Sequence, residues 1–506
     1  MAWLVHLLPY NSMVKGYLCS VLLMVAPALV AETNEAVRLL SLAECVKTAL
    51  EHNFDVKIER QDVEIARHAL NRAYGEFDPR VRMSGVRGNN RSPGGIDEQG
   101  RPFFATDVDQ DRISGGLDGL LPTGLQYDLS GNFTDSRGIL SDGPFENTRG
   151  DAGIELRQPL LKNLWIDEAR LTIKINRQQL RISELGLRGQ LMNVVGSVEA
   201  AFYDLLLARE SVKVQLEALA LAERLVAANR ERIRQGVMAT LDEKQAEAQA
   251  SAQRSLLLSA QRAVGLQENV LKALLSDHLA DWQDVSIQPV GDLGASAPRV
   301  QRNESWERGV SMRPDLLQAR EEVARRGSIV KFTRNQLFPQ VNAVGSYGHS
   351  ASDAEFSGAF AQVQHGSSPF YSYGLEMIVP LSRKLERENH QISRREQEKA
   401  DLQLRQLEQA VLLQIDDAVK VVEVNYERVG TTRQAREFAE IAQQAEQTKL
   451  ENGRSTSFIV LQLQRDLTTA RSEEIRALAE YNKALSQLAL REGSMLVRHN
   501  IELQLN

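Results

Sequence analysis

Two kinds of hydrophobic pattern alternate along this chain, and each occurs twice. Apolar and polar residues first alternate one by one over short segments, and apolar residues then recur at intervals of three, four and seven over much longer segments. The first pattern is typical of strands with one apolar face, and the second is typical of helices that pack against helices. The sequence therefore predicts a twofold internal repeat of short strands followed by helix pairs.

The predicted helix pairs are unusually long because no proline occurs between Pro159 and Pro289 or after Pro380. Proline costs roughly 3 kcal/mol inside a helix, so its absence permits long helices. Each pair is expected to turn at its one central glycine, Gly236 or Gly453. An outgoing helix of about 65 residues would be roughly 100 Å long. The expected helices cover about residues 167–234, 240–275, 387–451 and 457–490.

Each half is also expected to begin with a helix that leads into the strands. Ser41 and Glu44 match a capping box, in which serine accepts a bond from a backbone N–H and glutamate reaches back to the N-cap. A helix is expected from there to about Tyr74. The equivalent helix of the second half is expected over about residues 305–337.

Prolines mark the strand–helix junctions on both sides of each strand region. These junction residues are Pro79, Pro159, Pro339 and Pro380. Eighty positions separate the first two and 41 separate the last two, so the first half carries 39 additional residues. They include two alternating segments, 113–121 and 125–135, with a turn at Pro122 between them. The sequence therefore predicts an additional hairpin in the first half.

The N-terminal segment, residues 1–31, is typical of a secretory signal. Lys15 supplies positive charge, residues 17–25 are apolar, and small residues follow up to Ala31. A membrane anchor is the alternative, but the apolar run is shorter than the ~20 residues that a spanning helix needs. Removal of the signal would leave Cys45 without a disulfide partner. No later segment is expected to be a membrane helix, so contact with a bilayer would require strands.

Composition weighs against a nucleic-acid partner and against an enzyme. Sixty Lys and Arg residues face 67 Asp and Glu residues, a net charge of −7, whereas nucleic-acid binding favours a clustered basic surface. The chain has no phosphate-loop, zinc-protease or nucleophile-elbow motif, and its eight histidines are scattered. We therefore predict no catalytic residue, no metal site and no cofactor.

The predicted strands would need further copies of the chain if they lie in a bilayer. Every backbone polar group there must be paired, so the sheet must close. Four or six strands are too few, since membrane barrels have at least about eight. Three copies would give 12 strands, or 18 if the additional hairpin joins the wall. A soluble sheet over a core gives the same alternation, but the export signal and the lack of an obvious partner layer favour the membrane.

The order and spacing of these features resemble the TolC family of outer-membrane efflux proteins over about residues 42–492. The twofold repeat carries the resemblance, together with short segments at the strand ends and at the two turns. These segments are Phe77-Asp78-Pro79, Phe338-Pro339-Gln340, Gln158-Pro159-Leu160, Val379-Pro380-Leu381, residues 235–242 and residues 452–456. The resemblance implies a mainly α fold with β-strands, in which a trimeric membrane β-barrel is continuous with a periplasmic α-helical barrel.

The resemblance also implies a function and partners. A homotrimer in the outer membrane, extending into the periplasm, would passively conduct substrates to the exterior in efflux or type I secretion. Its partners would be a periplasmic adaptor, an inner-membrane pump of the RND or ABC type, and outer-membrane lipids. The alternative is a non-conducting periplasmic coiled-coil scaffold or adhesin. That alternative explains the long helices, but it does not explain the duplicated strand pairs that lead into them.

The expected domains follow the repeat. They are a signal peptide (1–31), a first efflux repeat (32–288), a linker (289–304), a second efflux repeat (305–492) and a C-terminal tail (493–506).

The two turns are expected to form the periplasmic tip. The resemblance implies that they dock the adaptor through Gly236, Val237, Met238, Ala239, Gly453, Arg454, Ser455, Thr456 and Ser457. Both glycines are also expected to be left-handed helix C-caps, which is a structural role. Thr240 and Glu243 match a second capping box at the start of the return helix.

Asp242, Arg454 and Gln462 are the candidates to line the aperture at the tip. Family members often carry acids shortly after the second tip glycine, where this chain has Ile459 and Gln462. A cation-binding acidic ring is therefore not expected at that level. Asp242 is alternatively a first-turn acid favoured by the helix dipole, and Arg454 is alternatively a solvated residue at a helix end.

Overall fold

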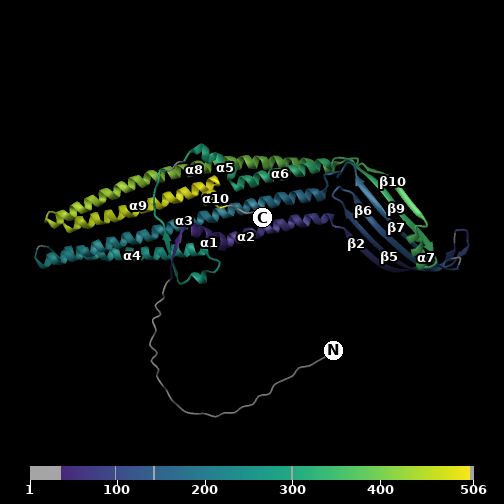
Figure 1. Cartoon of the computed structure of the whole chain (residues 1–506), viewed down its shortest axis with the longest axis horizontal. Helices are drawn as coiled ribbons and strands as arrows, with labels where there is room; N and C mark the ends of the chain where they lie inside the picture. Colours follow the sequence, from purple (N-terminus) through teal and green to yellow (C-terminus); the bar gives the residue numbers. More distant parts are fainter. Residues whose placement is uncertain (1–35, 97, 141–142, 237, 298–299, 502–506) are drawn as a thin grey trace, which may run out of the picture.

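The structure is a computed structural model that describes residues 36–96, 98–140, 143–236, 238–297 and 300–501. The predicted signal peptide, residues 1–31, and the tip residue Val237 lie outside the described residues. Figure 1 shows an elongated molecule with a β-sheet at one end and two helical hairpins that reach the other end.

The two long hairpins have the predicted bounds to within a few residues. The first consists of α3 (Glu168–Arg234) and α4 (Thr240–Leu275), and the second of α8 (Lys384–Glu451) and α9 (Ser457–Glu492). With 67 and 68 residues, α3 and α8 are each about 100 Å long at a rise of 1.5 Å per residue. The predicted twofold repetition of the long helices is therefore confirmed.

The helix that precedes the strands is broken into two in each half, whereas one continuous helix was predicted. Asn53 separates α1 (Leu42–His52) from α2 (Phe54–Tyr74), and Arg313 separates α5 (Arg302–Met312) from α6 (Pro314–Asn335). The Asn53 side chain caps α2 by accepting from the Asp55 N–H, and proline disfavours helical backbone in the residue before it. The capping box at Ser41 and Glu44 is confirmed, since each accepts from the backbone N–H of the other.

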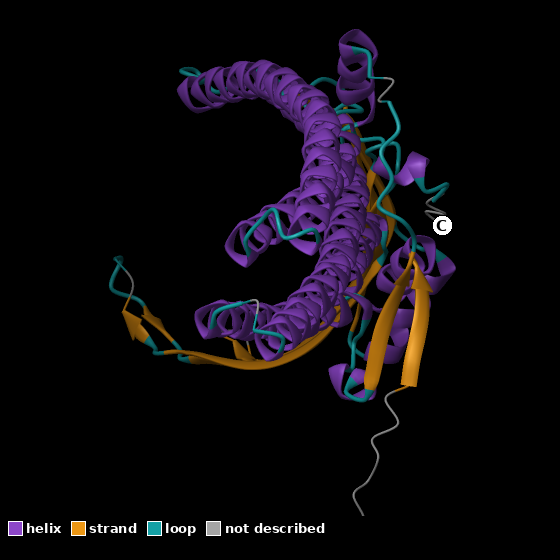
Figure 2. Cartoon of the chain, turned by 90° about the vertical axis from the view of Figure 1, so that its left-hand side faces the viewer, coloured by secondary structure: helices purple, strands orange, loops and turns teal. Residues whose placement is uncertain are grey.

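The helices form one curved layer (Figure 2). In the half of the molecule nearer the sheet, α2 contacts α3, α3 contacts α6, and α6 contacts α8. In the half nearer the tips, α3 contacts α4 and α9, and α9 contacts α8. Two hydrophobic clusters hold this layer together, one around Val195 and Leu205 of α3 and one around Ile415 of α8 and Tyr481 of α9.

One helix of the described part, α3, is apolar enough over one stretch to cross a membrane by length and composition. This departs from the expectation that no segment after the signal has that property. Two thirds of that stretch (67%) is buried inside the protein. Its apolar residues, such as Val195, Val198 and Leu205, pack in the larger core cluster, which accounts for its composition.

A six-stranded antiparallel sheet occupies the opposite end from the tips. Its order is β10-β9-β7-β6-β5-β2. Its strands are β2 (Arg80–Ser92), β5 (Thr106–Leu120), β6 (Gln126–Leu140), β7 (Gly143–Pro159), β9 (Gln340–Asp353) and β10 (Pro369–Ile378). The additional hairpin, β5–β6, is paired on both sides and is longer than predicted. It is therefore part of the wall and adds two strands to the four that the repeat supplies.

Several small elements carry no clear signal in the sequence. They are the parallel pair β1 (Ala36–Ser41) and β8 (Val285–Val290), the short pair β3 (Gly95–Ile96) and β4 (Pro102–Phe103), α7 (Phe356–His365), α10 (Met495–Arg498), and two 3-10 turns, Gly75–Phe77 and Leu279–Trp282. Pro289 lies in β8 opposite Leu40. The expected linker 289–304 thus contains the end of β8 and the start of α5.

Candidate functional site

The sheet has one apolar face and one polar face, and both can be followed across all six strands. One row of paired residues is entirely apolar or aromatic: Val81, Leu117, Leu129, Ile154, Tyr347 and Tyr371. The adjacent row, which points to the other face, is entirely polar: Arg80, Asp118, Asp128, Glu155, Ser346 and Ser372. Most of the apolar row is exposed, with Val81 at 72% and Tyr371 at 74%. A face of this kind needs an apolar surrounding.

The charges on the polar face neutralise one another. Arg82 forms ion pairs with Asp118, at 2.9 Å, and with Asp128, and Arg80 reaches Asp118 at 2.9 Å. At the other edge, Arg157 pairs with Glu376, whose carboxylate also accepts from Asn342 at 3.0 Å. Cations and anions alternate over this face, so it is hydrophilic without a dominant sign of charge.

Both edge strands of the sheet, β2 and β10, lack a partner on one side within the described residues. Every residue of β2 is exposed, and so is nearly every residue of β10. Each edge presents a row of backbone N–H and C=O groups that another strand could pair with.

The four prolines predicted at strand–helix junctions lie at the ends of sheet strands. Pro79 directly precedes β2 and Pro339 directly precedes β9, whereas Pro159 ends β7 and Pro380 follows β10 by two residues. Proline lacks a backbone N–H and cannot donate to the ladder. At the end of a strand this loses fewer ladder hydrogen bonds than in the middle.

The glycines of the two tips have the predicted left-handed backbone. Gly236 has φ +76° and Gly453 has φ +70°, each one residue past the helix C-cap. At the second tip, the Gly453 N–H donates to the Leu450 carbonyl and the Arg454 N–H donates to the Lys449 carbonyl at 2.8 Å. These bonds satisfy the last carbonyls of α8 in the manner of a Schellman motif.

The second predicted capping box, at Thr240 and Glu243, is wrong. Ala239 is the N-cap of α4, with φ −84° and ψ 149°, and it makes no side-chain capping bond. Thr240 is already the first helical residue. Since an N-cap side chain can reach the next turn only from the extended residue that precedes the helix, Thr240 is one position too late.

A buried polar contact joins the two hairpins just behind the tips. The hydroxyl of Ser457, at the start of α9, donates to Asn229 Oδ1 of α3 at 3.1 Å, and Asn229 Nδ2 donates to the Asp242 carbonyl of α4 at 3.3 Å. Ser457 Oγ also lies 3.9 Å from Met238 Sδ. Asn229 is fully buried. Asn229 was not predicted from the sequence, where its signal is a polar residue at an apolar position of the helix repeat.

The three aperture candidates lie close to the tips on different elements. Asp242 is half-buried in the first turn of α4, Arg454 is exposed directly after Gly453, and Gln462 is exposed in α9. Beside Arg454, Ser455 Oγ donates to Glu446 Oε1 at 2.5 Å. The Lys449 ammonium, followed by Ser455, lowers the pKa of Glu446. The remaining predicted tip residue, Thr456, is the N-cap of α9.

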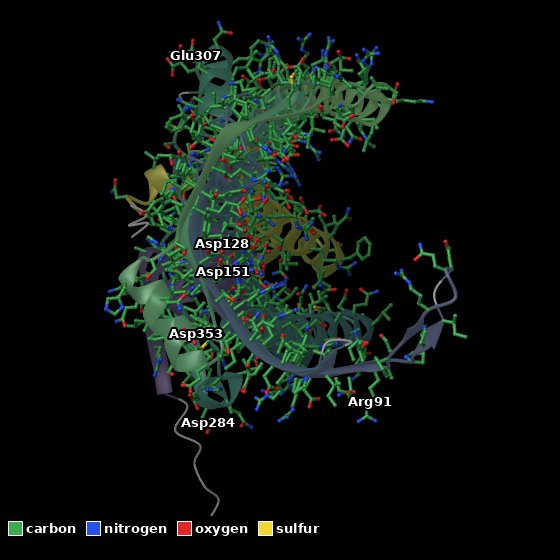
Figure 3. All side chains as sticks on the ribbon, turned by 90° about the vertical axis from the view of Figure 1, so that its right-hand side faces the viewer. Arg91, Asp128, Asp151, Asp284, Glu307 and Asp353 are labelled. Carbon is green, nitrogen blue, oxygen red and sulfur yellow. The ribbon has the colours of Figure 1, made fainter. Side chains whose placement is uncertain are left out.

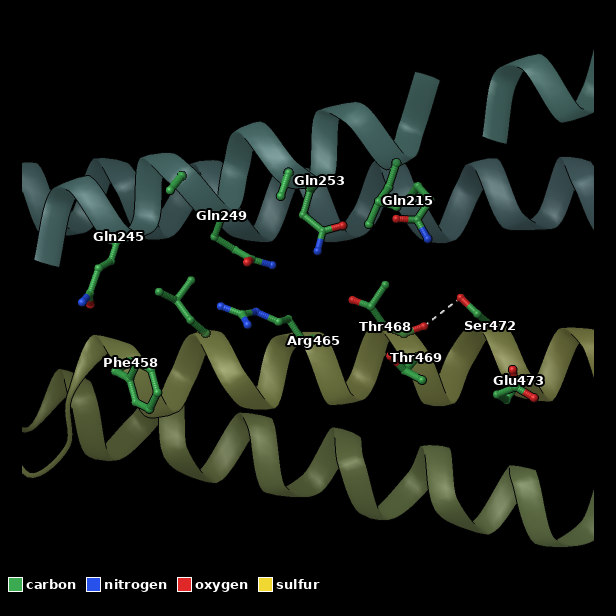
Figure 4. A pocket seen from close by; sticks show the side chains of 14 residues that line it. Gln215, Gln245, Gln249, Gln253, Phe458, Arg465, Thr468, Thr469, Ser472 and Glu473 are labelled. Carbon is green, nitrogen blue, oxygen red and sulfur yellow. Dashed lines mark hydrogen bonds between the residues drawn. The ribbon is translucent and has the colours of Figure 1, made fainter. Parts of the chain in front are cut away.

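A groove of about 670 Å³ runs between α4 and α9 in the same half of the molecule (Figure 4). Gln245, Gln249 and Gln253, at four-residue intervals on α4, face Phe458 and Arg465 of α9. The side-chain oxygen of Gln253 is buried without a hydrogen-bond partner. The four-residue spacing of glutamines is visible in the sequence, but only the packing of the two hairpins shows that they share a groove. Among the described residues, no group of three or more acidic, His or Cys residues could hold a metal ion.

A scan of protein families matches the outer membrane efflux protein family over residues 124–276 and 310–493. The chain belongs to this family. One matched segment lies in each half of the repeat, and together they cover most of the chain. The resemblance noted in the sequence is therefore confirmed, and the protein is an outer-membrane protein whose helices extend into the periplasm.

Solved structures of outer-membrane channels share the fold. OprN, described as an outer-membrane channel, is 16% identical with a TM-score of 0.65, and the match covers 90% of each chain. The CmeC channel of Campylobacter jejuni is 14% identical with a TM-score of 0.63, covering 92% of this chain and 90% of CmeC. The MtrE channel of Neisseria gonorrhoeae, in its open state, is 15% identical with a TM-score of 0.63, covering 90% and 89%. A search of curated proteins gave no significant match.

Proposed function

We propose that this chain forms a homotrimeric channel that passively conducts substrates from an inner-membrane pump and a periplasmic adaptor to the cell exterior. The observation that carries the proposal is the open six-stranded sheet with one exposed apolar face. In hydrocarbon the backbone groups of both edges must be paired. Six strands cannot close by themselves, so β2 of one copy pairs with β10 of the next.

The widths of the sheet and of the helical layer support a common tube. Six strands about 4.8 Å apart and tilted by about 40° cover about 38 Å of circumference. Four neighbouring helices at about 9.5 Å cover about 38 Å as well. Four strands would cover only about 25 Å by the same estimate. The additional hairpin thus makes the strand wall as wide as the helical wall that it continues.

Three copies follow from the family, whose members form trimers. Three six-stranded sheets make an 18-stranded barrel, with the apolar rows toward lipid and the polar rows toward the lumen. The channel supplies no energy of its own in this proposal, and the pump of RND or ABC type drives transport. The residues around Gly236 and Gly453 dock the adaptor, and Asp242, Arg454 and Gln462 line the aperture at the tip.

Disulfide cross-linking tests the closure of the barrel. Met83→Cys on β2 is combined in turn with Tyr371→Cys, Tyr373→Cys and Leu375→Cys on β10, because the register between copies sets which pair is opposed. Within one chain the two strands lie at opposite edges of the sheet, so a bond can form only between copies. Cys45 is buried and burial raises the pKa of its thiol to about 12, so it stays unreactive.

The expected result is a covalent trimer for at least one pair. The matched control, Ser84→Cys with Tyr373→Cys, places the two thiols on opposite faces and should give none. Monomer from every pair would refute the proposed closure. Deletion of the gene should also sensitise the cell to toxic compounds, and a soluble, non-conducting protein would favour the scaffold alternative.

A further inference from the structure

A short helix, α7, lies on the convex face of the sheet, outside the curve of the wall (Figure 3). It connects β9 to β10 and contacts β7 and β9. Ala359, at the centre of its packed side, is fully buried. A loop that only connected two strands would need no such packing, so the position of α7 calls for a reason.

The convex face changes character between two adjacent rows beneath α7. The outermost apolar row consists of Gly85, Ile113, Phe133, Gly150 and Ala351. The next row, farther from the helical layer, consists of Arg87, Asp111, Asp135, Thr148 and Asp353. Arg137, one row beyond, forms ion pairs with Asp111 at 3.1 Å and Asp135 at 2.8 Å. A hydrocarbon layer that covers the apolar rows must therefore end here.

The two flanks of α7 match the two sides of this boundary. On the apolar side, the rings of Phe356 and Phe360 pack against Phe133 with centroid distances of 5.3 and 5.8 Å. On the polar side, Gln362 Nε2 donates to Asp353 Oδ2 at 2.8 Å, and the Glu355 N–H donates to Asp353 Oδ1 at 3.2 Å. The helix therefore bridges the boundary in a fixed orientation.

Glycine at position 150 makes room for this ring cluster. A Cβ added to Gly150 would lie 2.3 Å from the Phe133 ring, so only glycine lets Phe133 lie flat against β7. Phe356 and Phe360 nevertheless stay 46% and 49% exposed. Three aromatic rings are thus gathered at the last apolar row, and the sheet covers only part of them.

We infer that α7 is an interfacial helix that binds the lipid surface and sets the depth of the sheet at the outer edge of the bilayer. An amphipathic helix lies in the plane of a membrane interface with its apolar side toward the acyl chains. Aromatic residues collect at the interfaces of membrane barrels. Phe133, Phe356 and Phe360 contact the ends of the hydrocarbon, and the opposite flank of α7, with Gln362 and His365, faces water.

Lipid is favoured over a second copy of the chain as the occupant of this surface. The helix overlies β7 and β9 in the body of the sheet, whereas the free edges are β2 and β10. The Phe flank is also continuous with the apolar rows of the convex face. The inference needs only the membrane location of the sheet, so it holds or fails independently of whether the protein conducts or which adaptor it binds.

Spin labelling tests the inference on the full chain in vesicles of phosphatidylethanolamine and phosphatidylglycerol. A nitroxide is attached at Phe360→Cys, and the matched control is His365→Cys, at an exposed position about 140° around the same helix. The readout is the accessibility of each nitroxide to oxygen, which enriches in hydrocarbon, relative to a water-soluble nickel chelate. We expect this ratio to be several-fold higher at position 360 than at position 365.

Two results would overturn the inference. Equal ratios at both positions would place α7 in water, and a label at position 360 shielded from both reagents would mean that protein covers it. If labelling prevents assembly, Phe360→Trp offers a conservative second variant. Its fluorescence, after subtraction of the parent protein, should be quenched by brominated lipids in the same vesicles, and absence of quenching would contradict lipid contact.

Discussion

Replacing Asn229 by alanine should loosen the contact between the two hairpins behind the tips. The change removes the bond from Ser457 Oγ to Asn229 Oδ1 and the bond from Asn229 Nδ2 to the Asp242 carbonyl. It also leaves the Ser457 hydroxyl, 1% exposed, without its oxygen acceptor. A net contribution of about 0.5–1.5 kcal/mol per bond gives a loss of about 1–3 kcal/mol.

This loss should act mainly on local opening of the tips, because the Ser457 bond joins α9 to α3, which also meet there through a small hydrophobic cluster. That cluster consists of Leu225, Leu450, Val460 and Leu461. The bond to the Asp242 carbonyl lies within the first hairpin and holds α3 to α4. A loss of about 2 kcal/mol raises the open population about 30-fold. Hydrogen exchange of the amides at the C-terminal end of α3 and the N-terminal end of α9 should therefore accelerate by about that factor.

Asn176→Ala is the matched control for this experiment. Asn176 lies on the same helix, but its side chain donates only to the Thr172 carbonyl one turn earlier. Its removal should leave exchange at the tips unchanged. Equal exchange rates at the tips in Asn229→Ala and in the parent protein would refute the view that this contact holds the hairpins together.

Three further predictions concern the sheet, the tips and the pH dependence of stability. Leu129→Arg, on the apolar face, should reduce stability in lipid by about 2–4 kcal/mol, measured by unfolding from vesicles, whereas Ser130→Arg on the polar face should not. Equal losses in the two variants would mean that the faces are assigned wrongly. A bulky residue in place of Gly236 or Gly453 would meet open space but would have to adopt a left-handed backbone. Such variants should abolish efflux while trimers survive, and full drug resistance in them would defeat this prediction. The pKa of Asp277 is lowered to about 2, chiefly by Lys57, so the contribution of Asp277 to stability is complete above the unfolded pKa near 4 and is lost as pH falls toward 2. Over that pH window the melting temperature of Asp277→Asn should fall less than that of the parent protein. Parallel melting curves of the two proteins would contradict the assignment.

Much of this fold could be predicted because its signals are long and repeated. The absence of proline after Pro159 and Pro380 gave the lengths of α3 and α8, and the left-handed glycines gave the positions of both turns. The breaks at Asn53 and Arg313 were missed because the apolar pattern continues across them. Each break depends on one local effect, an asparagine cap in the first half and a proline in the second.

The parts that could not be predicted depend on contacts between segments far apart in the chain. The parallel pair β1–β8 joins residues about 250 positions apart, and its six-residue strands are too short to show periodicity. The role of Asn229 depends on Ser457 in the other repeat. Helix α7 has only ten residues, and Phe356 and Phe360 gain meaning only from Phe133 on a different strand. The tip and aperture residues remain predictions.

We propose above that each chain supplies six strands to a barrel that only several copies can close. Electron cryomicroscopy of the protein in lipid nanodiscs tests it most directly. We expect three copies around one axis, with β2 of each copy paired to β10 of the next, 18 strands in the wall and α7 outside it. An assembly in which β5 and β6 leave the wall, or a single copy with both sheet edges unpaired in lipid, would contradict it.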